Sequence, residues 1–418
     1  MIKKQLESLT PYIILFSIAL FVFAIVYANA NFNLFTHNHH YPFALQAQMW
    51  LQGQLHLNHY YHHLEIAIFN DMYWISFPPF PSMVMLPFVA WVGPYYTPDH
   101  FIAFVISLLV LTYAYKIAFI QLKSRKYAIF FALFLCLGTN YLHVALWGAV
   151  WHMGQNLAFL FTLMAVYYAI TPKKEHIVLS LFYLCCAMGC RPLQVVYAPL
   201  ILYLLYRRAG VKPSTFAWML PLHGFPALAL GSVFLWLNFA RFGNIFEFGH
   251  NHLPLSIATP GGQFSTMHMM NHLRIMFFGL PTQIPLLTPI EERGQAFAFW
   301  LASPIVISYV VYLAYCIRHR ERFSKEFILV FLVLIPVLLG THLLLLSAHK
   351  CTGGRQFGYR YTVDILVVLF FGLTAILRKF RDTMNDSTIF RNLPLFMIGL
   401  TLNLLGTIDF IAFYHGLR

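Results

Sequence analysis

The chain has 418 residues, of which 60% are hydrophobic and only 10% are charged. Soluble domains carry about 25% charged residues, so this composition excludes a soluble globular protein. The formal net charge is +13, but Lys and Arg gather at the ends of apolar runs. That arrangement indicates orientation in a membrane and no partnership with nucleic acid.

Apolar runs of about 20 residues recur along the chain, which predicts an all-α polytopic membrane protein. Basic clusters, beginning with Lys3 and Lys4, mark the cytoplasmic end of successive runs. Their alternation gives about eleven transmembrane helices, within a range of about ten to thirteen. It places the N-terminus in the cytoplasm and the C-terminus in the periplasm. The expected spans are 11–30, 101–121, 127–143, 153–170, 177–190, 192–206, 216–240, 296–317, 327–346, 365–377 and 393–414.

The organisation expected from this pattern is a single integral membrane domain, 1–418, with three external loops. The loops are 31–99, 241–295 and 348–364. Within the first loop, apolar residues at helical spacing in 41–53 and 77–92 predict amphipathic helices that lie at the membrane interface.

The first external loop carries two acidic side chains that suit general-base catalysis, Glu65 and Asp71. A carboxylate in a partly closed cavity loses solvation, so its pKa rises towards the working pH. Either acid can instead be a surface group or the partner of a loop Arg in an ion pair. Both are therefore candidates for the base.

Histidines also cluster in the first loop, in HNHH (37–40) and HLNHYYHH (56–63). Neutral imidazole is a good metal ligand, so His37 and His39, together with Glu65, are candidate ligands for a divalent metal such as Zn, Mg or Mn. No spacing matches a known zinc signature. The alternative is a set of histidines that hydrogen-bond within the loop or line a substrate cavity.

The motif GGRQFGYRYTVD, residues 353–364, opens a returning helix and predicts a phosphate clamp. Guanidinium groups bind phosphate through paired donors, which assigns this role to Arg355 and Arg360, with Tyr361 beside them. Free N–H groups at the start of the helix add to the attraction. Asp364 lies four residues after Arg360 and is expected to orient it. Arginines that reach the lipid headgroups are the alternative.

A further basic residue, Arg241, lies in FARFGNIFEFGH, residues 239–250, at the exit of a span. We predict that it contributes to lipid-phosphate binding, with Glu247 nearby in the substrate cavity. An ion pair at the membrane interface is the alternative.

Two short external turns read WGAVWHMGQN (147–156) and CRPLQ (190–194). Their aromatic and amide groups suit contact with a sugar or an isoprenoid chain, and they suit helix packing equally well. The substrate-cavity candidates from these turns and the two preceding motifs are Trp147, Trp151, His152, Gln155, Arg191, Glu247, Gln356 and Asp364.

These motifs, in this order, resemble bacterial membrane glycosyltransferases of the GT-C class, in the branch related to protein O-mannosyltransferases. The resemblance spans most of the chain. It is carried by LQGQLHL, EIAIFNDMYWISFPPFPSMVMLP, CLGTNYLHVALWGAVWHMGQNLAF, CRPLQVVYAPL, NFARFGNIFEFGH and GGRQFGYRYTVD. The order and topology are specific for the superfamily and not for one substrate.

The resemblance implies a GT-C-like fold and an enzyme of the bacterial inner membrane. Such enzymes transfer a hexosyl or pentosyl group from a polyprenyl-phosphate donor to a lipid, glycan or protein acceptor in the periplasm. They place a catalytic acid in the first external loop, which Glu65 and Asp71 match by position. Many relatives carry their acid soon after the first span, where this chain has THNHHYP (36–42) and no carboxylate.

The alternative function is a non-catalytic protein that binds a lipid-linked glycan, or a transporter or flippase. The missing early carboxylate favours a non-catalytic role. The sequence offers no clear ionisable relay in mid-membrane, which argues against transport. Binding of a lipid-phosphate sugar without turnover would distinguish this alternative from the enzyme.

Overall fold

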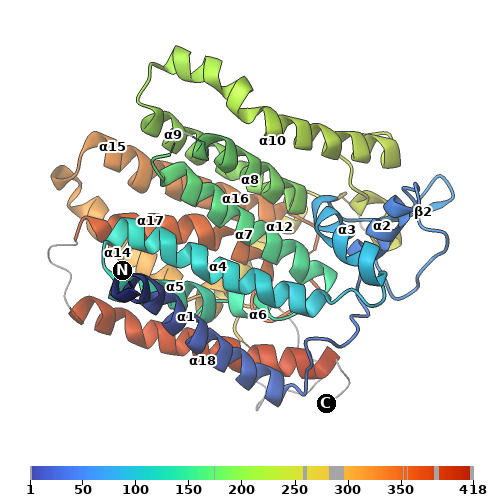
Figure 1. The fold of residues 1–418 in the computed structure, drawn as a ribbon, viewed down its shortest axis with the longest axis horizontal. Helices are drawn as coiled ribbons and strands as arrows, with labels where there is room; N and C mark the ends of the chain where they lie inside the picture. The colour runs from blue at the N-terminus through green and yellow to red at the C-terminus, as the bar shows by residue number, and fades with distance from the viewer. Residues whose placement is uncertain are drawn as a thin grey trace.

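The computed structural model describes most of the chain and shows a bundle of long helices (Figure 1). The residues it leaves undescribed are Met1, Lys174, 258–260, 282–295, Thr352, Arg355, 381–385 and 415–418.

Seven helical segments of the described chain are long and apolar enough to cross a membrane, which makes this a multi-pass membrane protein. They are built mainly from α1 (Ile2–Asn29), α4 (Asp99–Leu122), α7 (Val150–Ile170), α10 (Pro213–Phe242), α16 (Ile335–Ala348), α17 (Leu366–Arg378) and α18 (Asp386–Tyr414). Each of these helices begins or ends close to a boundary of a predicted span.

The other four predicted spans fall on helices of 12 to 15 residues. These are α5 (Arg125–Leu137), α8 (His176–Cys190), α9 (Ala198–Ala209) and α14 (Ile305–Arg318). At 1.5 Å per residue, such helices are shorter than a bilayer core of about 30 Å. Eleven spans therefore stays a prediction.

Short elements continue or join these helices. They are α6 (Tyr141–Ala145), η1 (Pro192–Tyr197), η2 (His250–His252), α11 (Pro254–Ile257), α12 (Thr266–Phe278), α13 (Phe299–Ala302), η4 (Arg320–Arg322), α15 (Lys325–Phe327), the π-helical η5 (Ile328–Leu334) and η6 (Arg360–Ile365). Of these elements, η1, η2, α11, α12 and η6 carry residues into the candidate site.

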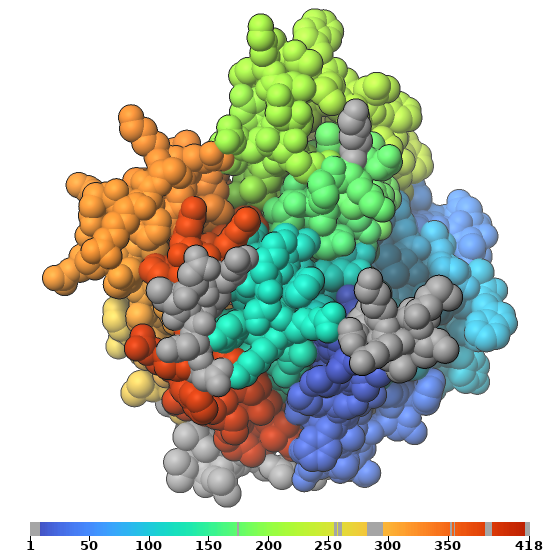
Figure 2. Space-filling view, turned by 60° about the vertical axis from the view of Figure 1, so that its left-hand side comes forward, coloured from blue at the N-terminus to red at the C-terminus, as the bar shows by residue number. Residues whose placement is uncertain are grey.

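The centre of the bundle is formed by α17, whose side chains from Leu366 to Leu377 are all buried. It contacts α4, α7, α14 and α16. A helix that is apolar all round is buried on every side. By contrast, α10 projects from the body (Figure 2) and exposes Trp218, Leu222 and Phe225, as suits a lipid-facing helix.

The predicted first external loop contains the expected helices as α2 (Pro42–Leu51) and α3 (Phe80–Val92), which pack against each other. It also contains an antiparallel hairpin, β1 (Ile66–Phe69) and β2 (Met72–Ile75), which the all-α expectation did not include. The hairpin turns at Asn70 and Asp71, both with positive φ (52° and 58°). Two such residues form the tight turn that matches the twist of two-residue hairpins.

In Figure 1 this loop region lies at one end of the bundle, where α18 also ends, whereas α1 starts near the opposite end. The helices therefore carry the described chain from one end of the bundle to the other.

Candidate functional site: an arginine-lined cavity

A cavity of about 1050 Å³ lies where the three predicted external loops meet the start of α7 and the end of α8. Its polar lining consists of Tyr60, Glu65, Trp151, His152, Arg191, His250, Gln263, His272, His349, Lys350, Cys351, Arg360 and Tyr361. Phe43, Phe77, Leu193, Phe246, Phe248 and Leu346 are among the apolar residues that complete it. The cavity can therefore hold a ligand with both a polar group and an apolar part.

Arg360 lies in the cavity wall with only 2% of its surface exposed. Its Nη1 donates to the backbone oxygen of Trp151 (2.7 Å) and its Nη2 to that of Gly353 (3.2 Å). Its backbone N–H donates to Oε1 of Gln356 (2.8 Å), which fixes the start of η6. Within the described part of the chain, no carboxylate pairs with Arg360 and its Nε has no acceptor. Its charge is held in place and left available for an anion.

Arg191 reaches the cavity because α8 ends one residue before it. Pro192 disfavours a helical conformation in the preceding residue, and Arg191 is extended (φ −143°, ψ 104°). Its Nε donates to Oδ2 of Asp364 at 2.5 Å. The side chain of Arg191 is therefore aimed by a buried carboxylate from the far end of the sequence.

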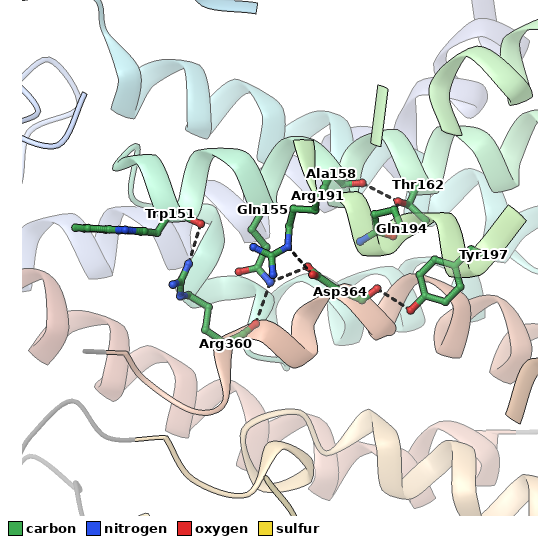
Figure 3. A network of polar contacts seen from close by, with 9 residues as sticks. All are labelled: Trp151, Gln155, Ala158, Thr162, Arg191, Gln194, Tyr197, Arg360 and Asp364. Atoms are coloured by element: carbon green, nitrogen blue, oxygen red, sulfur yellow. Dashed lines mark hydrogen bonds and ion pairs between the residues drawn. The ribbon is translucent and has the colours of Figure 1, made fainter. Parts of the chain in front are cut away.

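Asp364 is the centre of a buried network (Figure 3). Besides Arg191, it accepts a hydrogen bond from Nε2 of Gln155 (2.8 Å), and its backbone oxygen accepts one from the hydroxyl of Tyr197 (3.2 Å). The prediction that Asp364 orients Arg360 is wrong, because its two carboxylate oxygens bind Arg191 and Gln155. Gln155 supports Arg360 instead, since the same Nε2 also donates to the Arg360 backbone oxygen (3.0 Å).

Tyr361 links the two arginines of the cavity. The guanidinium carbon of Arg191 lies 4.9 Å from the centre of its ring, and that of Arg360 lies 5.2 Å away. Cations over an aromatic face are attracted by its negative charge distribution. The ring thus keeps two positive groups close together in one wall.

Glu65 is the one carboxylate among the described residues that line the cavity. Solvent reaches it through the cavity, although protein surrounds it on most sides. This burial raises the pKa of Glu65, while a hydrogen bond from the side chain of Trp151 and the charge of Arg360 oppose the rise. A carboxylate with a raised pKa that faces a cationic wall is suited to accept a proton from a bound ligand.

Several polar residues of the cavity were not among the sequence candidates, and they include His250, His349 and Lys350. Burial lowers the pKa of His250 and of His349 to about 4, so both imidazoles are neutral at pH 7. Lys350 donates to the backbone oxygen of His250 (3.4 Å). The sequence signal for Lys350 was a cation on the predicted external side, where the positive-inside bias works against it.

Several predicted site residues lie elsewhere. Asp71 is exposed at the tip of the hairpin, where its role is to form the turn. His37 stacks on Tyr95 (3.8 Å between centroids) and donates to its backbone oxygen (2.8 Å), and His39 is exposed. Trp147 is buried against Phe410 and is not part of the cavity wall. These four residues are therefore not brought together with Glu65.

The residues of the predicted metal site are not brought together either. Among the described residues, no group of three His, Cys, Asp or Glu side chains is placed to hold a metal ion. His37, His39 and Glu65 do not form such a group, and the cavity offers a single carboxylate beside cations. The residues that the structure describes therefore do not fit a divalent metal.

Arg241 is buried but lies outside the cavity. Its donors bind the backbone oxygens of Leu237 (3.2 Å) and Ile75 (3.1 Å) and Oδ1 of Asn238 (2.9 Å). It therefore ties the end of α10 to the hairpin, and we correct its predicted role in binding phosphate. The reason is that each of its three guanidinium nitrogens donates to an internal acceptor, and that it does not line the cavity.

Glu247 also has a structural role, in the loop that follows α10. It accepts hydrogen bonds from the backbone N–H of Gly249 (2.6 Å) and the side-chain amide of Asn251 (2.5 Å). It thereby shapes the loop that carries Phe246, Phe248 and His250 into the cavity. Gln356 accepts the hydrogen bond from the backbone N–H of Arg360 and thereby fixes the start of η6. The predicted phosphate ligand Arg355 lies outside the described residues.

Comparison with solved structures identifies the fold, whereas no family model and no curated protein sequence matches the chain. Two crystal structures of ArnT from Cupriavidus metallidurans are similar. The apo-state structure has a TM-score of 0.50 and 12% identity, over 91% of this chain and 61% of that one. The structure bound to undecaprenyl phosphate has a TM-score of 0.55 and 11% identity, over 97% and 77%. The fold is that of ArnT, a GT-C glycosyltransferase.

This identification confirms the GT-C-like fold expected from the sequence motifs. The chain spans about three fifths of the length of the apo ArnT chain it matches. At this level of identity the likeness concerns the fold alone.

Proposed function

We propose that this protein is a glycosyltransferase of the bacterial inner membrane that uses a polyprenyl-phosphate-linked sugar. The observation that carries the proposal is the cavity in which Glu65 faces Arg360, a buried cation with no carboxylate partner among the described residues. A structural neighbour of the same fold is bound to undecaprenyl phosphate. The donor's phosphate would lie against Arg360, with its apolar chain along the cavity's apolar residues.

The orientation follows the basic clusters of the sequence, with the N-terminus cytoplasmic and the C-terminus periplasmic. The cavity then opens on the periplasmic side, because it is built from the three predicted external loops. The acceptor would be a periplasmic lipid, glycan or protein that offers a hydroxyl group.

In the proposed reaction, the carboxylate of Glu65 takes the proton of the acceptor hydroxyl as its oxygen attacks C1 of the sugar. The bond between C1 and the phosphate oxygen breaks, and polyprenyl phosphate leaves with the bonding electrons. Its growing negative charge is stabilised by Arg360, with Arg191 and Lys350 nearby. A single direct displacement inverts the configuration at C1.

Burial of Arg360 strengthens this stabilisation. An ion held in a low-dielectric wall interacts more strongly with a charge than one in water. The hydrogen bonds to Trp151 and Gly353 fix its guanidinium before the donor arrives, so little reorganisation is needed during the reaction.

The test is Glu65→Gln in purified protein reconstituted in liposomes, supplied with a panel of undecaprenyl-phosphate sugars. General-base catalysis contributes about 10²- to 10⁴-fold, so release of undecaprenyl phosphate should fall by that factor. Asp71→Asn is the matched control, because it changes an acid of the same loop outside the cavity, and it should leave the rate unchanged.

Binding of undecaprenyl phosphate, measured by native mass spectrometry, separates chemistry from recognition. We expect Glu65→Gln to bind it as well as the wild type does. Wild-type protein that binds the lipid and turns over no donor in the panel would instead support the non-catalytic alternative.

A further inference from the structure

Lys350 is a cation of the cavity wall that has no paired carboxylate among the described residues. Its ammonium makes one long hydrogen bond, to the backbone oxygen of His250 (3.4 Å). An ammonium has three donors, so two of them remain for a ligand. Arg191, by contrast, is paired with Asp364. In the described lining, Lys350 and Arg360 are therefore the two cations that are available to an anion.

The backbone of Lys350 is fixed by pairing between two of the predicted external loops. Its N–H donates to the backbone oxygen of Gln263 (2.9 Å). The residue before it, His349, forms an antiparallel bridge with Phe264. A lysine side chain is flexible, so a fixed backbone limits the part of the cavity that its charge can reach.

Glu247 does not neutralise Lys350. Burial lowers the pKa of Lys350, and the charge of Glu247 opposes that change. The carboxylate of Glu247 accepts hydrogen bonds from Gly249 and Asn251 in its own loop, however, and it is not part of the cavity lining. The ammonium therefore keeps its charge towards the cavity, where a ligand can balance it.

The imidazole of His250 presents a hydrogen-bond acceptor beside Lys350. Its Nδ1 lies 2.6 Å from the backbone oxygen of Ser76, and a carbonyl oxygen can only accept, so Nδ1 carries the proton. Gly249 allows this approach, because a Cβ atom there would overlap the backbone of Ser76. Burial lowers the pKa of His250 to about 4, so Nε2 keeps its lone pair at pH 7. This part of the wall thus offers a cation together with an acceptor for a hydroxyl group.

Tyr361 connects this part of the wall to the proposed phosphate ligand. Its ring centre lies 5.2 Å from the guanidinium carbon of Arg360 and 5.9 Å from the ring of His349. The rings of His349 and His250 are 6.3 Å apart. One aromatic ring therefore separates Arg360 from the histidines next to Lys350. The sugar of the donor is bonded directly to the phosphate, so it is the part of the donor that would lie here.

We propose that Lys350 selects a donor with an acidic sugar, binding a carboxylate of the sugar while His250 accepts a hydrogen bond from a neighbouring hydroxyl. The inference rests on the proposed function, because it takes the sugar to be linked to a phosphate at Arg360. It goes further by naming the chemical class of the sugar. The phosphodiester of the donor carries one negative charge, which Arg360 balances, so the second available cation suits a second anionic group.

The experiment compares acidic and neutral donors in binding titrations of the full-length protein by native mass spectrometry, without an acceptor. The probes are two matched pairs of undecaprenyl-phosphate sugars, glucuronic acid with glucose and galacturonic acid with galactose. The variants are Lys350→Met, Lys350→Arg and the control Lys379→Met. Lys379 is exposed outside the cavity, over the ring of Phe327 (5.2 Å), and it too has no paired carboxylate among the described residues.

We expect the wild type to bind the acidic member of at least one pair about 10- to 100-fold more tightly than the neutral member, as for one hydrogen bond to a charged group. Lys350→Met should reduce this preference to about threefold or less, because the remaining contacts do not depend on the charge of the sugar. Lys350→Arg should retain most of the preference, since it keeps the charge. Lys379→Met should bind all four donors as the wild type does.

Equal affinity of the wild type for the acidic and neutral members of both pairs overturns the proposal. A preference that Lys350→Met leaves unchanged overturns it as well. A third contrary result concerns undecaprenyl phosphate without a sugar. If Lys350→Met loses as much affinity for this lipid as Arg360→Ala does, Lys350 belongs to the linking phosphate and not to a separate carboxylate site.

The binding titration needs no turnover, so this inference and the proposed reaction can fail separately. An acidic preference that depends on Lys350, combined with full activity of Glu65→Gln, would keep the sugar site and remove the proposed base. Turnover that depends on Glu65, without any acidic preference, would keep the proposed reaction and remove the sugar site.

Discussion

Two arginines of this protein are equally buried, and only one of them is available to a ligand. Arg241 and Arg360 are each 2% exposed. All three nitrogens of the Arg241 guanidinium donate to acceptors within α10 and the hairpin. Arg360 donates through two nitrogens to backbone oxygens, while its Nε has no acceptor among the described residues and its side chain faces the cavity.

The difference shows that burial and a basic residue near a membrane surface do not define an anion site. The two arginines differ in how many of their guanidinium nitrogens donate to acceptors within the protein. A guanidinium whose donors are met by rigid internal acceptors holds the fold together. One that keeps donor capacity towards a cavity, without a paired carboxylate, can bind a phosphate.

The largest expected effect is loss of lipid binding in Arg360→Ala. Removing one member of a desolvated charge pair costs about 2–5 kcal/mol, so affinity for undecaprenyl phosphate should fall by roughly several hundredfold. Arg360→Lys should recover only part of this loss, because an ammonium lacks the planar fork. Titration by native mass spectrometry checks both, and wild-type affinity in Arg360→Ala would place the phosphate elsewhere.

The matched substitution of Arg241 should lower the stability of the fold. Arg241→Ala leaves the oxygens of Ile75, Leu237 and Asn238 without their donor, at a cost of about 2–3 kcal/mol in the free energy of unfolding. We expect a lower thermal unfolding temperature in detergent for this variant. Its folded fraction should bind undecaprenyl phosphate within about threefold of the wild type, and a loss as large as that of Arg360→Ala would erase the distinction.

The smallest effects concern the glutamate near each arginine. Glu65 has a raised pKa, so the folded state holds its proton more tightly than the unfolded chain. The ionised carboxyl therefore destabilises the fold as pH rises above the unfolded pKa. Glu65→Gln should unfold at a higher temperature than the wild type at pH 8, and the gap should shrink towards pH 4.

Glu247→Gln should change the stability of the fold in the opposite direction. Glu247 accepts hydrogen bonds from Gly249 and Asn251, so its replacement should lower stability at pH 8, by about 1 kcal/mol. Thermal unfolding at the two pH values measures both variants together. A stabilised Glu247→Gln protein would contradict the structural role given to that loop.

Much of the architecture could be predicted from the sequence, because apolar run length and charge alternation are imposed by the bilayer. The helices α2 and α3 were also predicted, since helical spacing of apolar residues is a local signal. The β1–β2 hairpin was missed although its signal is local too. The pair Asn70–Asp71 is suited to positive φ, and the acidic residue was interpreted as chemistry where it forms a turn.

The site was harder to predict from the sequence, because its contacts join residues that are far apart in the chain. Arg191 and Asp364 are 173 positions apart, and no spacing rule relates them. The prediction that paired Asp364 with Arg360 used local helical spacing, whereas η6 is a 3-10 helix that turns the carboxylate towards Arg191. Arg360 and Glu65, which both line the cavity, were singled out because charges in the predicted external loops are uncommon in such a chain.

The distance between Arg191 and Asp364 along the chain also bears on how the protein is made. At about 5–20 residues per second, the ribosome supplies Asp364 on the order of ten to thirty seconds after Arg191, given their separation of 173 residues. Until then the arginine has no carboxylate partner and must stay in contact with water or lipid headgroups. The wall of the cavity can close only when the segment that begins at η6 is inserted, so its completion is a late step of biogenesis.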